Sequence, residues 1–469
     1  MILPIIIQIS TCMHFVHRPY IPHETISAIA TPPGEGGIAV IRVTGKDALN
    51  VVSKIFSGPI HSYITHTAHL GKIHDLQGNF LDEVLVLVML GARSFAGEDT
   101  VEIHCHGGSI VTRKVLEATL TAGARAALPG EFSFKAFING KIDLTQAEAV
   151  QELIGAKNEI ALQKAEEQLQ GALSDKINLF QKELFDVAAI LEAWVDFPEE
   201  GLEFASKEEI LAMLESTFEK MRNLSLTFHE GQVIKEGLSL CLIGPPNAGK
   251  SSLMNTLLGK ERAIVTEIAG TTRDILEDQL LLGGLHFRIK DTAGIRQTEE
   301  LVEKEGIRRS KMAMESADLV LLLLDISKEL SEEELMLLDS APFDKTLLVW
   351  NKADLPHAAP INTKLPFVKI SAKESFGIPA LKEAIDQIIW KKGPPSQEAI
   401  VITNARHKMA LDEALTAGSR LVEGLKSDIS PEFLSSDMRA VLRELGTIIG
   451  KDIGDDILSA IFSKFCVGK

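Results

Sequence analysis

The chain has 469 residues, of which 45% are hydrophobic and 24% are charged, so its length predicts about three domains with ordinary globular cores. With 48 basic and 65 acidic residues, the net charge of -17 argues against broad electrostatic coverage of a nucleic acid, while a local basic patch or a basic partner stays open. The four cysteines are scattered, which disfavours a disulfide framework or a four-thiolate zinc site and makes the cytoplasm the default location.

Residues 1–23 carry no pattern to which a function can be assigned. Their apolar opening run is broken by Pro4 and has no basic flank, which disfavours a signal peptide. Because clear patterning begins near Glu24, we expect an extension here or a start codon that was assigned too early. No later segment has the roughly 18 uninterrupted apolar residues that a membrane span needs.

Residues 24–142 are predicted to form an N-terminal α/β domain. Strand-like runs at Ile38–Val43, Val84–Leu90 and Val101–Cys105 are separated by glycine-rich turns. His104 and His106 share one face of the last run. Without a third ligand nearby, strand packing is favoured over a metal site for this pair.

A helical segment, an α/β block and a second helical segment follow. Glycine and proline are sparse in residues 143–235, and apolar residues recur there at helical spacing. Across residues 236–392, Leu238–Ile243 and later apolar runs alternate with helical stretches, which predicts a mostly parallel sheet covered on both faces. Residues 393–469 return to helical periodicity after a Gly-Pro-Pro-Ser break. This order indicates an α/β domain inserted into a helical host.

Three ordered motifs in the α/β block indicate a guanine nucleotide. Gly244–Ser251 is a phosphate-binding loop whose lysine would reach the outer phosphates and whose serine hydroxyl would ligate magnesium. Asp291–Gly294 would place its aspartate near that magnesium and its last amide at the terminal phosphate. Asn351–Asp354 would select the base, because a carboxylate accepts both N–H donors of the guanine edge, and Ser371–Lys373 would support that recognition.

The residue that orients the attacking water is not evident from these motifs. Ile295 stands directly after the second motif, where Ras-like enzymes carry a glutamine. The side chains that could take this role, each of which could equally be a solvated charge or amide on a helix surface, are Gln297, Glu299, Glu300 and Glu303. Arg273 could be mistaken for an arginine finger. A switch residue that is held by a local carboxylate is at least an equally good interpretation.

Further motifs lie along the whole chain. Outside the three nucleotide motifs they are Ala30–Gly37, Ile41, Arg42, Gly97–Asp99, Glu102, His106–Gly108, Pro129–Ser133, Ala136, Phe137, Lys141, Gln146–Ala149, Gly270–Asp274 and Phe465–Lys469. With these residues, the chain resembles the MnmE (TrmE) family of tRNA-modification GTPases from about Glu24 to its last residue. The guanine motifs alone would fit several bacterial GTPases, whereas the N-terminal motifs and the Cys-x-Gly-Lys terminus would not.

The resemblance implies a multidomain α/β plus all-α fold. Its parts are an N-terminal α/β domain that dimerises and binds a folate, a helical domain made of residues 143–235 and 393–469, and an inserted Ras-like P-loop G domain. It also implies a homodimer, away from membranes, that works on tRNA with the flavoprotein MnmG in a heterotetramer or larger complex. Together they add an aminomethyl or carboxymethylaminomethyl group to C5 of the wobble uridine, using a tetrahydrofolate one-carbon unit and GTP hydrolysis.

The resemblance further implies sites for a folate and two metal ions. The residues that match positions holding 5-formyltetrahydrofolate are Arg42, Glu102, Lys141 and Lys469. Basic side chains suit the folate carboxylates, and a carboxylate suits the donors of the pterin ring. The potassium ligands correspond to Asn247, Thr266, Ile268 and Thr271, and the magnesium ligands to Ser251 and Thr272. Potassium would replace part of the charge that an arginine finger supplies.

For hydrolysis, the resemblance assigns catalytic roles to Glu303, Lys250 and Thr272 and implies activation when two G domains meet. The GTP-binding residues it implies are Asn247, Ala248, Gly249, Lys250, Ser251, Ser252, Thr266, Glu267, Ile268, Ala269, Gly270, Thr271, Thr272, Asp291, Thr292, Ala293, Gly294, Asn351, Lys352, Ala353, Asp354, Ser371, Ala372 and Lys373.

The role of Cys466 and the function of the chain each have more than one interpretation. Cys466 could be a nucleophile that adds to a uracil ring, but a structural or folate-adjacent role is favoured, because free cysteines usually pack as small hydrophobes. The competing functions are a GTP-regulated switch in ribosome assembly and a dimeric scaffold whose G domain acts as a timer. The first usually comes with an RNA-binding module, and the sequence has neither a KH-like Gly-x-x-Gly loop nor a basic C-terminal region.

Overall fold

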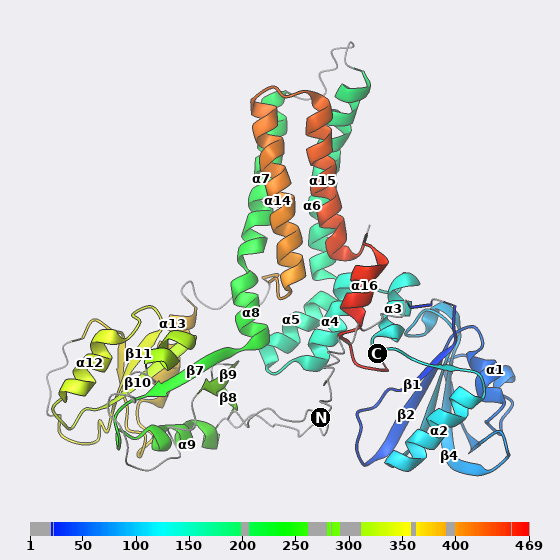
Figure 1. Cartoon of the computed structure of the whole chain (residues 1–469), viewed down its shortest axis with the longest axis horizontal. Helices are drawn as coiled ribbons and strands as arrows, with labels where there is room; N and C mark the ends of the chain where they lie inside the picture. The colour runs from blue at the N-terminus through cyan, green and yellow to red at the C-terminus, as the bar shows by residue number, and fades with distance from the viewer. Residues whose placement is uncertain are drawn as a thin grey trace, which may run out of the picture. The chain divides into compact units, whose positions relative to one another are not determined.

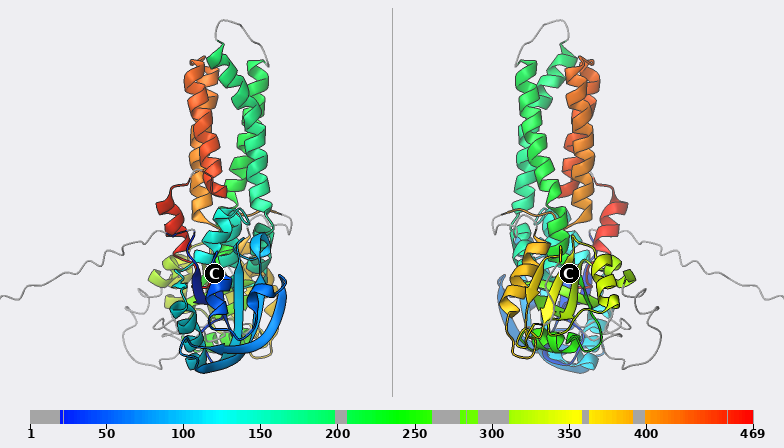
Figure 2. Two further views of the ribbon diagram at one scale, coloured as in Figure 1. Left: turned by 90° about the vertical axis from the view of Figure 1, so that its right-hand side faces the viewer. Right: turned by 90° about the vertical axis from the view of Figure 1, so that its left-hand side faces the viewer.

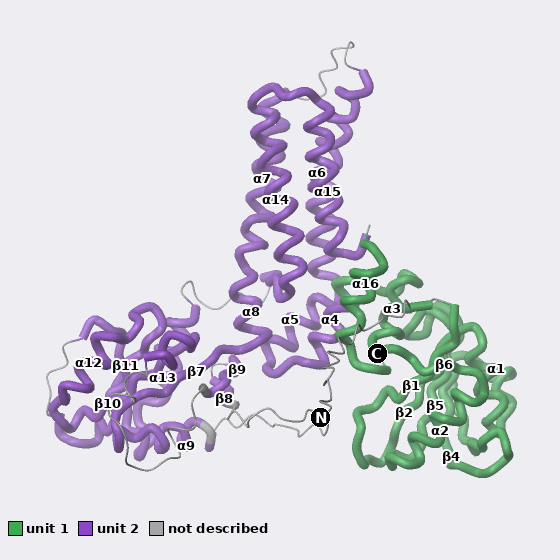
Figure 3. The backbone as a smooth tube through the Cα atoms, viewed as in Figure 1, with its two compact units in different colours: residues 1–147, 452–469 green, residues 148–451 purple. Residues whose placement is uncertain are grey.

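The computed structural model of the chain describes residues 20–21, 23–197, 206–260, 279–282, 284–290, 311–357, 363–390, 399–451 and 453–468. The chain divides into two compact units, one of residues 1–147 with 452–469 and one of residues 148–451 (Figure 3). The division falls inside helix α4 (Leu144–Gly155). The domain limits predicted from the sequence stay predictions; in the structure, residues 452–469 group with the N-terminal unit.

The first unit is built on a six-stranded sheet with the order β3-β4-β5-β2-β1-β6. Its strands are β1 (Ile26–Ile29), β2 (Gly36–Thr44), β3 (Thr67–His74), β4 (Phe80–Met89), β5 (Thr100–Gly107) and β6 (Arg125–Ala126). All neighbours are antiparallel except β1 and β6. On β4, Val84, Val86 and Val88 are buried while Glu83 and Leu85 are exposed, so one face of the sheet forms the core.

Helices of the first unit cover that face and one end of the sheet. They are α1 (Ala48–Ser53), α2 (Ser109–Thr121), α3 (Glu131–Ile138) and α16 (Asp455–Phe462), with short 3-10 turns at Ile60–Ser62 and Gly91–Arg93. Helix α2 contacts β1, β2, β4 and β5 (Figure 1). A separate aromatic cluster in the same unit contains Phe134, Phe462 and Phe465, so the C-terminal residues share a core with α3.

The second unit contains a bundle of four long helices. These are α6 (Ala172–Asp196), α7 (Lys207–Leu226), α14 (Ala405–Lys426) and α15 (Pro431–Ile449), which run side by side in Figures 1 and 2. On α14 the residues Leu411, Ala414 and Leu421 are buried at helical spacing. Gly418 lets α14 approach α7 closely, because a Cβ atom there would lie 2.6 Å from the Phe218 ring. The predicted helical domain is confirmed.

The same unit contains a second six-stranded sheet, ordered β12-β11-β10-β7-β9-β8. Its strands are β7 (Leu238–Ile243), β8 (Gln279–Leu282), β9 (Leu285–Lys290), β10 (Leu319–Asp325), β11 (Thr346–Asn351) and β12 (Phe367–Lys369). Only β8 pairs antiparallel. The predicted mostly parallel sheet of a G domain is therefore confirmed.

Apolar cores lie on both faces of this second sheet, as predicted. One core takes side chains from α8 (Phe228–Glu236), α9 (Lys250–Lys260) and α13 (Ile378–Ile389), and the other takes side chains from α12 (Glu332–Ser340). Helix α5 (Glu159–Leu169) adds Ile160 and Ala161 to the first of these cores. Among the described helices, none combines the length and the apolar character that crossing a membrane requires.

Candidate functional site

The phosphate-binding loop joins the buried strand β7 to helix α9. Asn247 and Gly249 adopt positive φ angles of 62° and 96°, which curl the loop. A Cβ atom on Gly244 would lie 2.2 Å from the Leu323 carbonyl oxygen, and one on Gly249 would lie 2.2 Å from Asn351 Nδ2. These two glycines are therefore required by the close approach of β10 and β11 to the loop.

Lys250 opens helix α9 and folds over the loop. Its Nζ donates to the carbonyl oxygens of Gly244 at 2.6 Å and Pro245 at 2.8 Å. Burial lowers the pKa of Lys250. Ser251 and Ser252 follow as exposed residues in the first turn of α9, where backbone N–H groups and the helix dipole favour an anion.

Asn351, at the end of β11, connects two of the nucleotide motifs. Its side chain is buried; Nδ2 donates to the Ala248 carbonyl at 2.8 Å and Oδ1 accepts from Ala372 N at 3.0 Å. Thr256 of α9 donates to the Ala372 carbonyl at 2.8 Å. The asparagine amide thus fixes the phosphate loop against the Ser371–Lys373 segment, a structural role beyond the base selection predicted for it.

Asp354 is the exposed carboxylate of the base-selecting motif. A hydrogen bond from Ser371 is the main cause that lowers its pKa, so the group is ionised at neutral pH. The Ala353 amide donates to the Ile370 carbonyl at 2.9 Å, which ties the motif to the segment after β12. An ionised, exposed carboxylate held in this way can accept the paired N–H donors of a guanine edge.

Asp325 and Thr256 were not among the predicted site residues. Asp325 ends β10, and its Oδ2 accepts from Lys352 Nζ at 2.7 Å. Burial raises the pKa of Asp325, but hydrogen bonds from Lys352 and Ser327 outweigh burial and lower it. A signal was present: an aspartate directly follows the apolar run Leu319–Leu324, and the carboxyl ends of parallel strands meet at one sheet edge.

In the first unit, Arg42 and Glu102 face each other across β2 and β5. Arg42 Nε and its terminal Nη2 each lie 2.9 Å from Glu102 Oε1, and its other terminal nitrogen donates to the Gly468 carbonyl at 3.3 Å. The guanidinium carbon lies 5.1 Å from the Phe95 ring centre and 5.6 Å from that of Phe132. The two predicted residues are thus paired with each other, between aromatic rings that were not predicted.

The C-terminal tail lies against this pair in the same unit. Gly468 has a φ of 92°, and a Cβ atom there would lie 2.4 Å from the Ile29 carbonyl oxygen. The Gly130 amide donates to the Cys466 carbonyl at 3.2 Å, while the Cys466 side chain is exposed. Lys141 lies apart from these contacts and donates from Nζ to the Ala92 carbonyl at 2.7 Å.

Comparison with known proteins covers nearly the whole chain. Residues 25–141 match the family model "GTP-binding protein TrmE N-terminus", and residues 144–466 match "MnmE helical domain". The chain is 61% identical to the tRNA modification GTPase MnmE of Protochlamydia amoebophila (strain UWE25) over 459 residues, which is 97% of this chain and 100% of that protein. The chain belongs to the MnmE family.

Two further MnmE proteins show the same extent of similarity. The one from Syntrophotalea carbinolica is 44% identical over 453 residues, 95% of this chain and 99% of its own length. The one from Chlamydia trachomatis serovar A is 43% identical over 452 residues, with the same shares of both chains. The family resemblance seen in the sequence is therefore confirmed.

Several residues for which the sequence or the MnmE resemblance suggests a role lie outside the described part of the chain. They are Thr266, Glu267, Ile268, Ala269, Gly270, Thr271, Thr272, Arg273, Asp291, Thr292, Ala293, Gly294, Ile295, Gln297, Glu299, Glu300, Glu303 and Lys469. Their roles stay predictions.

The two histidines of β5 have carboxylate partners. His104 lies 3.4 Å from Glu102 Oε2, and His106 Nδ1 lies 2.8 Å from Asp82 Oδ1. Each histidine thus has a separate partner, and the described residues contain no group of three potential ligands that could hold a metal ion. The strand-packing interpretation of this pair stays a prediction.

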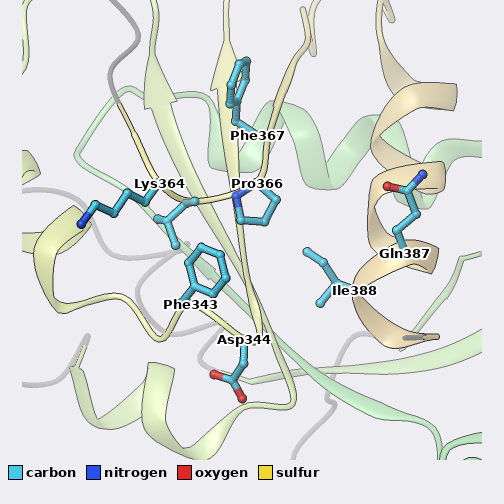
Figure 4. Close-up of a pocket in the computed structure, with 8 residues that line it drawn as sticks. Phe343, Asp344, Lys364, Pro366, Phe367, Gln387 and Ile388 are labelled. Carbon is cyan, nitrogen blue, oxygen red and sulfur yellow. The ribbon is translucent and has the colours of Figure 1, made fainter. Parts of the chain in front are cut away.

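A pocket in the G domain lies away from the nucleotide motifs. Figure 4 shows Phe343, Phe367 and Ile388 around it, with Lys364 and Asp344 at its margin. Residues 343–344 precede β11 and residues 364–366 precede β12, so the pocket is at the amino ends of strands whose carboxyl ends carry Asn351 and Ser371. It contains no predicted site residue.

Proposed function

We propose that this chain is a potassium-activated GTPase that acts with the flavoprotein MnmG in tRNA modification. The pair would add an aminomethyl or carboxymethylaminomethyl group to C5 of the wobble uridine, with a one-carbon unit from a tetrahydrofolate. The observation that carries the GTPase part is the Asn351 side chain, which holds the phosphate loop to the segment beside Asp354. The tRNA part is supported by similarity to MnmE proteins over 97% of the chain.

Magnesium and potassium fit the described part of the loop. Asn247 is exposed on a turn of positive φ, and Ser251 is exposed at the start of α9, so an amide oxygen and a hydroxyl are accessible. Oxygen donors of this kind suit hard cations. We assign Ser251 to magnesium and Asn247 to potassium, and a cation bound there would supply positive charge to the phosphates.

A reduced folate fits the charges in the first unit. Glu102 offers a carboxylate for pterin N–H donors, and Lys141 offers an exposed ammonium for a glutamate carboxylate. Arg42 would hold Glu102 in place and anchor the tail through the Gly468 carbonyl, so that Lys469 follows a fixed residue. The Cys466 side chain is exposed, which argues against its packing as a small buried hydrophobe and fits a folate-adjacent or a reactive thiol.

We also propose that the chain is a homodimer. Leu70 of β3 and Leu85 of β4 are directly opposite each other and exposed, on the face of the first sheet that the core does not use. An apolar pair on a sheet surface of this kind suits a second copy of the chain. The association with MnmG and with tRNA is proposed from the family alone.

Mass analysis of wobble uridines tests this function. In cells that lack the chain, we expect the modified wobble uridine to disappear and to return when the wild-type chain is supplied. A wobble-uridine profile identical to that of normal cells would remove the modification role and would favour a GTP-regulated switch in ribosome assembly instead.

A further inference from the structure

A single carboxylate binds both segments that link the G domain to the helical bundle. These two connections are helix α8, which leads into β7, and residues 399–404, which lead into α14. Glu152 on α4 accepts from Lys235 Nζ at 2.5 Å through Oε1 and from Thr403 Oγ1 at 2.9 Å through Oε2. Lys235 stands in the last turn of α8, shortly before β7, and Thr403 precedes Asn404, the N-cap residue of α14. The side chain of Glu152 is only 11% exposed, so the carboxylate is largely shielded from solvent, while Lys235 is 39% exposed.

The two connections also contact each other directly. A Cβ atom on Gly231 would lie 2.0 Å from the Ile402 carbonyl oxygen, so the backbones of the two connections touch. The Ile402 amide donates to Thr227 Oγ1 at 3.0 Å. The two connections are therefore packed against each other, and we expect a displacement of one to displace the other.

Helix α5 binds the same two connections. Asn158 Nδ2 donates to the Ile234 carbonyl at 3.0 Å, and Lys164 Nζ donates to the Ala399 carbonyl at 2.9 Å. Together with Glu152, these residues bond α4 and α5 to both connections.

The β8–β9 hairpin reaches α5 from the nucleotide side. Strand β8 directly follows residues 261–278, and β9 ends directly before Asp291, so the hairpin joins the two segments that carry the predicted nucleotide-responsive residues. A Cβ atom on Gly284 at the turn of the hairpin would lie 3.4 Å from Ile160 of α5. Ile160 also packs against the core that contains Leu282 and Leu285 of the hairpin, so the hairpin and α5 are in contact.

On the other side, α4 is bonded to the end of α15. One helical turn before Glu152, the buried Glu148 accepts from Arg406 Nε at 3.0 Å and from a terminal Arg406 nitrogen at 2.8 Å. The same arginine donates to the carbonyls of Thr447 at 2.6 Å and Ile448 at 2.9 Å. Helix α15 ends at Ile449, and the chain then continues into residues 452–469.

From these contacts we propose that Glu152 is a positioning residue that couples GTP turnover to tRNA modification. By holding Lys235 and Thr403, it makes the two connections move with α4, and Glu148 and Arg406 carry that movement to the end of α15 and so to the C-terminal segment. If the connections are released from α4, the G domain still hydrolyses GTP. The connections then move without α4, so the movement does not reach the end of α15. This inference rests on the proposed function.

The test compares GTP turnover with modification in full-length variants. Glu152→Gln keeps the size of the side chain and removes its charge, and Lys235→Met removes the same ion pair from the other side. We expect GTP turnover by the purified chain to stay within about twofold of wild type for both. The fraction of modified wobble uridine in cells that lack the native chain should fall about tenfold, within the range expected when a residue between two coupled sites is changed. Lys235→Arg, which keeps the ion pair, should modify normally.

Glu183→Gln is the matched control. Glu183 has the same kinds of partner, Lys220 Nζ at 2.8 Å and Thr217 Oγ1 at 2.8 Å, but it joins α6 to α7 within the bundle. It should leave both readouts unchanged.

The outcomes separate the inference from the proposed function. If the wild-type chain itself restores no modified uridine, the proposed function fails. If the wild type restores it and Glu152→Gln restores it equally, the inference is overturned. A parallel loss of GTP turnover and modification in Glu152→Gln would also overturn it, because a purely structural role would produce that result.

Discussion

At the scale of single residues, the predicted base-selecting motif combines a buried side chain with an exposed one. Asn351 is turned inward and bonded to two loops, whereas Asp354 is exposed and its carboxylate is kept ionised by Ser371. We expect base selection to rest on the exposed Asp354 carboxylate, while the Asn351 side chain holds the phosphate loop and the Ser371–Lys373 segment together.

Asp354→Asn should change the preferred base. An amide offers one donor and one acceptor where the carboxylate offers two acceptors, so the variant should prefer xanthosine triphosphate over GTP. We expect the ratio of kcat/KM values for the two nucleotides to shift by about a hundredfold, from the loss of one well-formed pair of hydrogen bonds. Asp344→Asn, an exposed carboxylate beside the pocket of Figure 4, is the control. Unchanged GTP preference in Asp354→Asn would contradict this assignment.

Glu148 should make stability depend on pH in the acid range. Burial raises its pKa, but the charge and hydrogen bonds of His407 and Arg406 outweigh burial and lower it to about 2, from an ordinary value of 4.5. A carboxyl with a lowered folded-state pKa stabilises the fold above its ordinary pKa, and this contribution is lost as the pH falls from 4.5 towards about 2.

Glu148→Gln should therefore lower the free energy of unfolding by about 3 kcal/mol at neutral pH, because it leaves Arg406 without its buried partner. The difference from wild type should shrink as the pH falls below about 4.5. Urea unfolding followed by circular dichroism at neutral pH and at about pH 3 measures both values. Glu219→Gln, at an exposed position of α7, should behave as wild type, and a pH-independent deficit in Glu148→Gln would contradict the ion-pair explanation.

Sequence motifs predicted which residues gather at the nucleotide site, but not all of their tasks. The Gly244–Ser251 loop and Asn351–Asp354 were recognised because local spacing defines them. The bond from Asn351 to Ala248 spans 103 positions, so no local pattern reveals it. Phe95 and Phe132 were missed for the same reason, since their relation to Arg42 exists only in the folded sheet.

At the scale of elements, the two connections of the G domain are tightly packed. Gly231 lies inside α8, where its missing side chain lets the outgoing chain approach. Glycine costs helix stability by itself, so its presence here is explained by the contact with Ile402.

Gly231→Ala should destabilise the chain. The new Cβ atom would lie 2.0 Å from the Ile402 carbonyl oxygen, so the connections would have to separate. We expect a loss of about 2 kcal/mol in the free energy of unfolding, as for other overpacked sites. Gly259→Ala in α9, which has open space around it, should instead be neutral or stabilising by up to about 1 kcal/mol. Equal urea midpoints for the two variants would show that Gly231 is not a point of close contact.

Strong apolar runs predicted their strands well. Leu238–Ile243 coincides with β7, since a strand buried on both faces is a continuous apolar run. Strand β3 was not predicted, because Thr67–His74 is an edge strand with polar residues and a glycine, and its pairing with β4 defines it. Helical periodicity identified α16, but not that its residues group with the N-terminal unit.

At the scale of the whole molecule, the proposed activity requires that GTP turnover depends on potassium and on the association of two G domains. The described loop offers Asn247 as an accessible oxygen donor, while the other proposed potassium ligands lie outside the described residues. The cation would act in place of an arginine finger.

Replacing potassium by sodium should lower GTP turnover about tenfold or more at saturating magnesium, because sodium is too small for a site built for potassium. Phosphate release by the purified full-length chain measures this rate. GTP affinity, measured separately, should change little and serves as the control. Equal turnover in both cations would remove the potassium proposal while leaving the guanine site intact.

The central claim is that GTP hydrolysis by this chain serves wobble-uridine modification. Its most direct measurement is the amount of modified wobble uridine formed in a reaction of the purified chain, the flavoprotein, a tetrahydrofolate one-carbon donor, the amino donor and unmodified tRNA. We predict modified uridine with GTP and none with a non-hydrolysable GTP analogue. Equal amounts of modified uridine with the two nucleotides would contradict the account.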